Sequence, residues 1–117
     1  MKKIFLIMSI LILNYSKVSA QEIEDGWYKA TVKYSNYMTY TFETYKLRVK
    51  VKYDKVVEIS FGEGGSIHSG YNNEGYTYSG GTLYPEKDYR GVIISAEASV
   101  NIYESNGTVR NFKIKIE

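Results

Sequence analysis

Apolar and polar residues alternate along three stretches of the first half of the chain, which is the period of a half-buried β-strand. In residues 26–34 the side chains that share one face are Tyr28, Ala30, Val32 and Tyr34. Ser35 and Asn36 then interrupt the pattern. Residues 39–53 place on one face Tyr45, Leu47, Val49, Val51 and Tyr53. Residues 56–61 place inward Val57, Ile59 and Phe61. We therefore predict three strands here, with these residues facing the core.

Face matching constrains the turn between the second and third of these strands, because directly opposed residues must share a face. A two-residue loop at Asp54 and Lys55 would pair Val51 with Glu58. An odd-numbered loop pairs Val51 with Val57 or Ile59, and it sets Glu58 against Lys50 or Lys52 on the outer face. We therefore predict a three-residue turn.

The C-terminal part of the chain predicts a second hairpin. One strand alternates through Ile94, Ala96, Ala98, Val100 and Ile102, and the next through Phe112, Ile114 and Ile116. A three-residue loop at 105–107, with Gly107 left-handed as a bulge residue, pairs Val100 with Phe112 and Ala98 with Ile114. It also pairs Glu97 with Lys115 outside. Residues 92–102 could instead form a helix around Ala96 and Ala98, but the alternation favours a strand.

Between the two halves lies a glycine-rich segment, 62–91, that holds eight of the ten glycines. Short strands are expected at 66–71, 75–79 and 82–84, and turns at 72–75 and 79–81. We expect one all-β domain, an antiparallel sandwich or a partly open barrel of about seven strands.

Residues 1–20 have the layout of a cleavable signal peptide. Lys2 and Lys3 precede the apolar run 4–13, and the small residues at 18–20 suit cleavage before Gln21. The run is shorter than the roughly 20 residues of a membrane-spanning helix. We expect an exported product that is periplasmic, at the cell surface or secreted, comprising residues 21–117, with no transmembrane segment.

Charge and cysteine content narrow the class of protein. Lys2, Lys3 and Lys17 account for three of the 15 basic residues, which leaves 12 against 13 acidic ones and a formal net charge of −1 after cleavage. Nucleic acid is therefore not an expected partner. The chain has no cysteine, so its stability must come from apolar burial rather than from disulfides.

No residue pattern reaches the standard of a catalytic, metal or cofactor site. His68 is the only histidine, and a metal site needs several converging ligands. The carboxylates Glu63, Glu74, Glu86 and Asp88 could in principle form a hydrolase pair, but loop carboxylates are mostly solvated. The glycine-rich stretch 62–65 is followed by no Lys-Ser or Lys-Thr pair, so no phosphate loop is expected. We expect no cofactor, no metal and no enzyme.

One hairpin has a familiar pattern. The stretch VKYDKVVEISF (51–61) resembles the strand–turn–strand of exported FMN-binding domains. That family attaches flavin through a Ser-Gly-Ala-Thr-like motif. The nearest stretch here is ISAEAS (94–99), which has neither the glycine nor the threonine, so no flavin is expected.

A basic row on the second strand is the clearest charged feature, formed by Lys46, Arg48, Lys50 and Lys52. It is either an anion-binding stripe or a solvated face whose lysines discourage edge-to-edge pairing.

Tyrosine is the most informative residue type, since 12 of the 13 tyrosines follow residue 20. Tyr28, Tyr45 and Tyr53 are expected in the core. Others lie in polar, glycine-rich segments that are typical of adaptable recognition surfaces. The candidate ligand-binding residues are Tyr71, Tyr76, Tyr78, Tyr84 and Tyr89, with His68, Asn72 and Asn73 as polar partners. These rings could equally cover the core of a small sheet.

These features predict a non-catalytic binding module that recognises a glycan or a protein through these loops. A partner protein that works by β-strand addition is the alternative, and a small hydrolase is a third possibility. The oligomeric state stays open.

Overall fold

The computed structural model describes residues 21–70 and 75–117, which form eight β-strands and one short 3₁₀ helix. The strands are β1 (Gly26–Asn36), β2 (Thr41–Lys52), β3 (Lys55–Ser60), β4 (Ser66–His68), β5 (Tyr76–Gly80), β6 (Tyr84–Lys87), β7 (Ile93–Glu104) and β8 (Val109–Ile116). The helix, η2 (Gly62–Gly64), joins β3 to β4. Within the described ranges there is no helix long and apolar enough to cross a membrane. The expected signal peptide lies outside these ranges.

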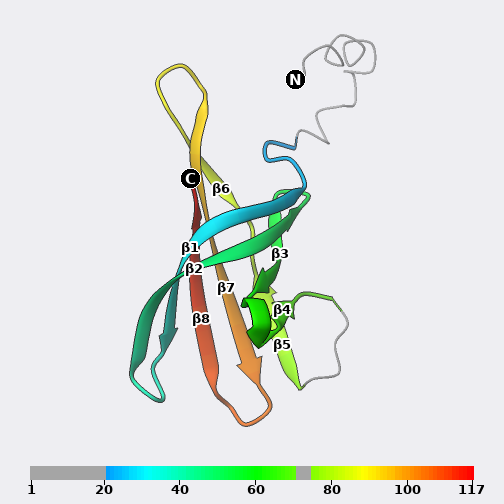
Figure 1. Cartoon of the computed structure of the whole chain (residues 1–117), viewed down its shortest axis with the longest axis vertical. Helices are drawn as coiled ribbons and strands as arrows, with labels where there is room; N and C mark the ends of the chain where they lie inside the picture. The colour runs from blue at the N-terminus through cyan, green and yellow to red at the C-terminus, as the bar shows by residue number, and fades with distance from the viewer. Residues whose placement is uncertain (1–20, 71–74) are drawn as a thin grey trace.

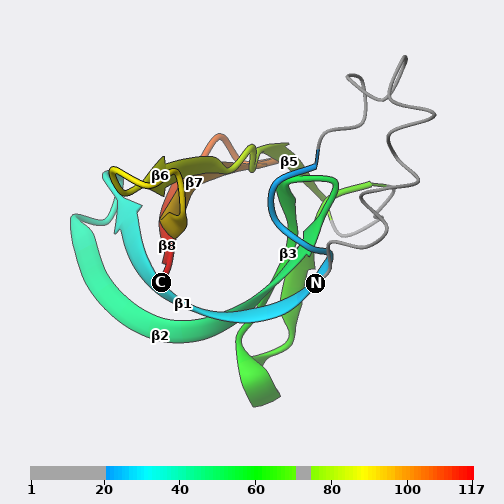
Figure 2. The same ribbon diagram turned by 90° about the horizontal axis from the view of Figure 1, so that it is seen from above.

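The strands form one antiparallel sheet in the order β4-β3-β2-β1-β8-β7-β5, with β6 pairing β7 beside β5. Seen from above, the sheet curls into a nearly closed ring that runs from β7 through β8, β1 and β2 to β3 (Figure 2). Figure 1 shows the same strands from the side. The all-β prediction is confirmed, and of the two expected arrangements the sheet takes the barrel-like one.

A single backbone segment between β5 and β6 closes most of the remaining gap. The Gly81 N–H donates to the Ser99 carbonyl of β7 at 2.8 Å, and the Gly81 carbonyl accepts the Val56 N–H of β3 at 2.7 Å. The next residues extend this contact, because Thr82 forms a bridge with Lys55 and the Leu83 N–H donates to the Asp54 carbonyl at 2.9 Å. The segment therefore joins the two ends of the sheet.

Glycine is required at this closure for two reasons. Gly80 and Gly81 have φ angles of 91° and 106°, a region that L side chains rarely adopt. A Cβ on Gly81 would also lie 2.6 Å from the Val56 carbonyl oxygen, and one on Gly80 would clash with the Ser99 carbonyl. The two glycines were expected to form a turn, whereas Gly80 ends β5 and Gly81 continues as the bridging residue.

The core fills the inside of the ring, and the alternation in the sequence predicts most of it. The largest fully buried side chains are Phe112, Ile59, Ile102, Ile114, Val32, Val49, Val51, Val56 and Val100. Tyr28, Tyr34, Leu47 and Phe61 pack partly buried against this core, as their inward faces predict. The first strand also runs two residues beyond its expected end, to Asn36.

Four residues expected in the core are not buried there. Val57 is only half-buried, and Val56 takes its place in the core, because Val57 is the extra residue of a bulge between the pairs Val51–Val56 and Lys50–Glu58. Tyr45 lies opposite the buried Val32 and faces inward, but it is 39% exposed because β3 pairs only with the second half of β2. Tyr53 is 71% exposed, because it belongs to the β2–β3 turn. Ile94 is exposed because of a bulge, in which Glu86 pairs with Ser95 and Lys87 with Ile93, so that Ile94 is an extra residue.

The C-terminal hairpin has the predicted register throughout. Val100 pairs with Phe112, Ala98 with Ile114 and Glu97 with Lys115. The Glu104 N–H donates to the Thr108 carbonyl at 2.9 Å, which encloses a three-residue loop, and Gly107 has a φ of 94°. A short loop with one left-handed glycine satisfies both faces of the hairpin, so this prediction is confirmed.

The predicted three-residue turn between β2 and β3 is wrong. Lys52 pairs with Lys55 across a two-residue turn, in which Tyr53 and Asp54 have φ angles of 53° and 60°. Val51 then pairs with Val56 rather than with Val57 or Ile59. A shift in register restores the expected pair of Lys50 with Glu58, and Ile59 lies opposite Val49. The odd residue that face matching demands is therefore present, but it forms a bulge within β3.

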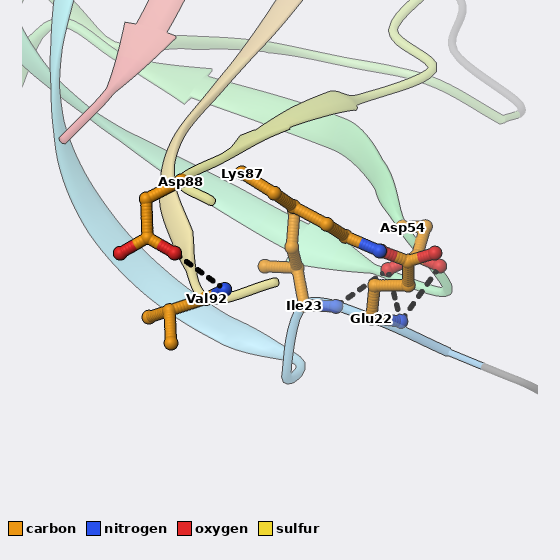
Figure 3. Close-up of polar contacts among 6 residues, drawn as sticks. All are labelled: Glu22, Ile23, Asp54, Lys87, Asp88 and Val92. Carbon is orange, nitrogen blue, oxygen red and sulfur yellow. Dashed lines mark hydrogen bonds and ion pairs between the residues drawn. The ribbon is translucent and has the colours of Figure 1, made fainter. Parts of the chain in front are cut away.

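Residues 21–25 cover one end of the sheet and hold this turn in place (Figure 3). Ile23 is buried in the core, and its N–H donates to the Asp54 carboxylate at 2.8 Å. The Glu22 N–H donates to the same carboxylate, and the Tyr53 N–H donates to Asp25 at 2.9 Å. Lys87 forms an ion pair with Glu22 at 3.2 Å. These contacts favour the left-handed turn over the predicted one.

The substitution Gly81→Ala tests the closure. Its matched control is Gly91→Ala, since Gly91 has a φ of 84° but nothing within 4 Å of an added Cβ. We expect the control to lose about 1–2 kcal/mol from backbone strain alone, and Gly81→Ala to lose at least about 2 kcal/mol more because it separates β3 from β7. Urea unfolding of residues 21–117 measures both. Equal losses for the two variants would contradict the role assigned to Gly81.

Candidate functional site

Two of the candidate tyrosines, Tyr76 and Tyr78, pack on the inner side of the sheet where its two ends meet. Both lie on β5, are partly buried and pack against the core. The Tyr78 hydroxyl donates to the Val56 carbonyl at 2.6 Å, and the Tyr76 hydroxyl accepts the His68 N–H at 3.2 Å. Each ring therefore links β5 to strands on the far side of the gap, which is the core-covering role that the sequence left open.

Burial changes the acidity of one of these two hydroxyls. Desolvation raises the pKa of the Tyr78 hydroxyl well above its ordinary value of 10.0, with smaller contributions from Tyr76 and Glu58. The neutral hydroxyl is thus the form that the fold requires, since only this form can donate to the Val56 carbonyl.

Three of the other candidates lie within the described residues. Tyr84 on β6 is 70% exposed, and Tyr89 in the loop after β6 is 95% exposed. His68 ends β4, with its Nδ1 atom 3.2 Å from the Ser69 carbonyl oxygen. Tyr71, Asn72 and Asn73 lie outside the described residues.

The loop that carries Tyr89 is organised by Asp88. Its carboxylate accepts the Arg90 N–H at 2.8 Å. It also accepts the Val92 N–H at 3.0 Å (Figure 3). Hydrogen bonds, chiefly from the Arg90 side chain and then from the Val92 backbone, hold the pKa of Asp88 below its ordinary value. This loop therefore presents Tyr89 to solvent on a defined turn.

The four candidate tyrosines within the described residues do not form one surface. Tyr76 lies opposite Glu104 on β7, whereas Tyr84 lies opposite Glu97. Seven residues along a strand correspond to about 23 Å. Tyr84 instead belongs to a different surface, on the outside of the sheet.

This surface is formed by cross-strand rows on β2, β1, β8 and β7. One row runs from Lys46 through Thr31, Lys115 and Glu97 to Tyr84. A second row runs from Thr44 through Lys33 and Lys113 to Ser99. A third pairs Arg48 with Lys29. We call this surface the basic face.

Two adjoining hollows lie on the basic face. The first has a volume of about 390 Å³, and its polar lining comprises Thr31, Lys33, Tyr84, Glu97, Ser99, Lys113 and Lys115. The second has a volume of about 510 Å³, and its polar lining comprises Lys29, Thr31, Lys46, Arg48, Lys115 and Glu117. Because Thr31 and Lys115 line both, the hollows form one continuous surface across β8.

The charge on this surface is unbalanced. The two hollows hold six basic side chains and two carboxylates, Glu97 and Glu117. Lys33 lies directly opposite Lys113, and such like-charge pairs are destabilising. Across the described part of the chain, Lys115 makes the one ion pair on this face, with Glu117 at 3.4 Å. An anion in either hollow would therefore relieve repulsion.

Catalytic groups are not concentrated in the same way. Glu58 lies opposite His68 in the β3–β4 ladder, where both side chains are half-buried. In residues 21–70 and 75–117, no three His, Cys, Asp or Glu side chains come together as a possible metal site.

The sequence showed only part of the basic face. The row on β2 was recognised, but Lys29, Lys33, Lys113 and Lys115 were not assigned to a site. The sequence does contain a pattern that points to these lysines, because each lies at an outward position of an alternating strand. Only the neighbouring positions of β1 and β8 in the sheet bring them together.

Comparisons with protein-family models, with curated proteins and with solved structures found no match. The functional argument therefore depends on the geometry described above.

The substitution Tyr78→Phe tests the internal role of this ring. It leaves the buried Val56 carbonyl without its partner, and we expect a loss of about 1–2 kcal/mol at neutral pH. A hydroxyl whose pKa is raised by folding stabilises the fold fully below pH 10, and this contribution declines as the pH rises further. The difference between wild type and variant should therefore shrink above pH 10.

Urea unfolding at a series of pH values measures this difference. Tyr84→Phe is the control, since its ring is 70% exposed and removal of its hydroxyl leaves no buried carbonyl without a partner. A constant difference between wild type and Tyr78→Phe up to alkaline pH would show that the Tyr78 hydroxyl does not contribute through this bond.

Proposed function

We propose that this protein is a small, exported, non-catalytic binding module that recognises an acidic glycan on its basic face. The observation that carries the proposal is the pair of adjoining hollows with six basic side chains and two carboxylates. Residues 21–117 carry a formal net charge of −1, so this positive surface reflects the arrangement of charges and not the composition. Electrostatic complementarity of this kind selects an anionic ligand.

Three further features favour a carbohydrate over a small anion. The exposed Tyr84 ring borders the first hollow, and aromatic faces present apolar area together with a hydroxyl. The Thr31 hydroxyl lies between Lys46 and Lys115, the Ser99 hydroxyl lies beside Lys113, and both can bond to sugar hydroxyls. The hollows continue into one another across β8, which suits a chain of several sugar units. Among the described residues, Tyr84 is thus the one residue of the expected ligand-binding set that also belongs to the proposed site.

The alternative, a partner protein that works by strand addition, has its own supporting observation. The first seven residues of β2, 41–47, pair with β1 on one side and with no described strand on the other. A strand of another chain could add to this edge.

A small hydrolase remains the third possibility, with Glu58 and His68 as the neighbouring pair.

Binding of dextran sulfate and of uncharged dextran tests the acidic-glycan proposal, because the two polymers share a backbone and differ in charge. We expect dextran sulfate to bind and dextran not to bind, with affinity falling as salt rises. Replacing both Lys33 and Lys113 by Ser should weaken binding about tenfold, roughly 1.4 kcal/mol. The double variant should fold normally, because it removes a repulsive pair.

The matched control is the double replacement of Lys52 and Lys55 by Ser. These lysines are exposed and directly opposed like the first pair, but they lie outside both hollows. An equal loss of binding in the control would show general charge attraction rather than a site. A glycan array with the same three proteins then identifies the natural sugar class.

Export is tested by the mass of the product after expression of the full chain in a bacterium. We expect the protein outside the cytoplasm to begin at Gln21, following cleavage after Ala20. A cytoplasmic product that retains residues 1–20 would contradict the proposed localisation.

A further inference from the structure

The first half of β2 is a long unpartnered strand edge. Residues 48–52 of β2 pair with β3, whereas 41–47 have no neighbour on that side among the described residues. Two aromatic side chains on this segment, Phe42 and Tyr45, are exposed, and Phe42 is 55% exposed. An edge of this length with exposed apolar side chains is a template for pairing with another strand.

The hydrogen bonds around Val56 show which backbone groups of β2 face the free edge. The Val56 N–H donates to Gly81 and its carbonyl accepts from Tyr78, so both groups point away from β2. Val51, which pairs with Val56, must therefore direct its own backbone groups toward β1. The β1–β2 ladder continues without a bulge, so the direction alternates regularly from Val51 to Thr41. Phe42, Thr44 and Lys46 thus present their N–H and C=O groups to the free edge.

This edge is self-complementary in one antiparallel register. A two-fold axis at Thr44 pairs Phe42 of one copy with Lys46 of the other, which allows a cation–π contact. It also pairs Glu43 with Tyr45, a carboxylate with a hydroxyl that already bonds to it within one chain at 2.7 Å. Thr41 then lies opposite Leu47, so the register uses all seven residues of the free edge.

Neighbouring registers are less favourable. A two-fold axis at Glu43 would oppose two carboxylates, and an axis at Lys46 would oppose two ammonium groups. An axis at Tyr45 would pair Lys46 with Thr44 and Glu43 with Leu47, which leaves both charges without a partner. Charge pattern and backbone direction therefore select the register centred on Thr44.

We propose that the free edge of β2 binds a second copy of this chain, in antiparallel register about Thr44, and joins the two sheets. Closed two-fold symmetry satisfies both edges and leaves none exposed for further addition. Lys46, which would otherwise discourage edge pairing, faces the Phe42 ring of the other copy in this register.

The pairing also bears on the ligand. Lys46 and Arg48 belong to the basic face, so two β2 strands side by side would make the two basic faces continuous. Two linked sites on one polymer give avidity without new contacts. This consequence rests on the proposed acidic-glycan function, whereas the pairing itself does not.

Single-cysteine variants test the register, because the chain has no cysteine of its own. In the proposed dimer the two Thr44 Cα atoms lie about 5.5 Å apart, within the range that a disulfide bridges. Lys46 has the same outward face and is also exposed, but its two copies would be about 13 Å apart. We therefore expect Thr44→Cys to form a disulfide-linked dimer under mild oxidation at least tenfold faster than Lys46→Cys.

Sedimentation of the protein produced from the full chain provides the second measurement. The wild type should shift from monomer to dimer with rising concentration, and Thr44→Val, which keeps the backbone N–H, should do the same. Thr44→Pro removes one N–H from the free edge and should remain a monomer with unchanged circular dichroism.

These outcomes decide the proposal. Equal cross-linking rates at positions 44 and 46, or a dimer that persists in folded Thr44→Pro, would overturn it. If Thr44→Pro fails to fold, the cross-linking comparison decides alone. If the wild type fails to bind dextran sulfate while Thr44→Cys still forms the disulfide-linked dimer, the acidic-glycan proposal fails and the dimer proposal stands.

Discussion

The backbone of one residue, Gly81, decides whether this sheet can enclose a core. Its N–H bonds to Ser99 on β7 and its carbonyl bonds to Val56 on β3, so it bridges the two ends of an otherwise open sheet. Tyr78 adds a side-chain bond to the same Val56 carbonyl. The core residues inward of β3 are shielded from water only while this bridge holds, since no disulfide crosses the gap. The free energy of folding must therefore come from the burial of a small apolar core and from a few backbone hydrogen bonds across the gap.

Local patterns in the sequence predict much of the sheet, and contacts between distant residues explain what they miss. The register of β7 with β8 follows from alternation and one glycine, because both strands and their loop are contiguous. The turn between β2 and β3 does not follow, because its left-handed form depends on Asp54 accepting N–H groups from Glu22 and Ile23. The exposure of Ile94 likewise depends on a bulge against β6, which period-2 reasoning does not detect.

The candidate site shows the same division. The glycine- and tyrosine-rich composition indicated a recognition surface. Tyr76 and Tyr78 have this same sequence context, but they pack against the core and link β5 to β3 and β4. Composition alone does not distinguish a binding tyrosine from one that covers the core. The basic face needs β1 beside β8, strands from opposite ends of the domain. Sequence alternation showed that Lys33 and Lys113 point outward, but strand order is a property of the whole chain. The lysines therefore become a site only in three dimensions.

The pairing of β1 with β8 also governs when the domain can fold. Hairpins such as β7–β8 form within microseconds, but β1 finds one of its two neighbours only after β8 has been synthesised. Sheets dominated by such distant contacts fold slowly. The sheet of a nascent chain therefore stays incomplete until β8 has left the ribosome, so that one side of β1 has no strand to pair with during most of synthesis.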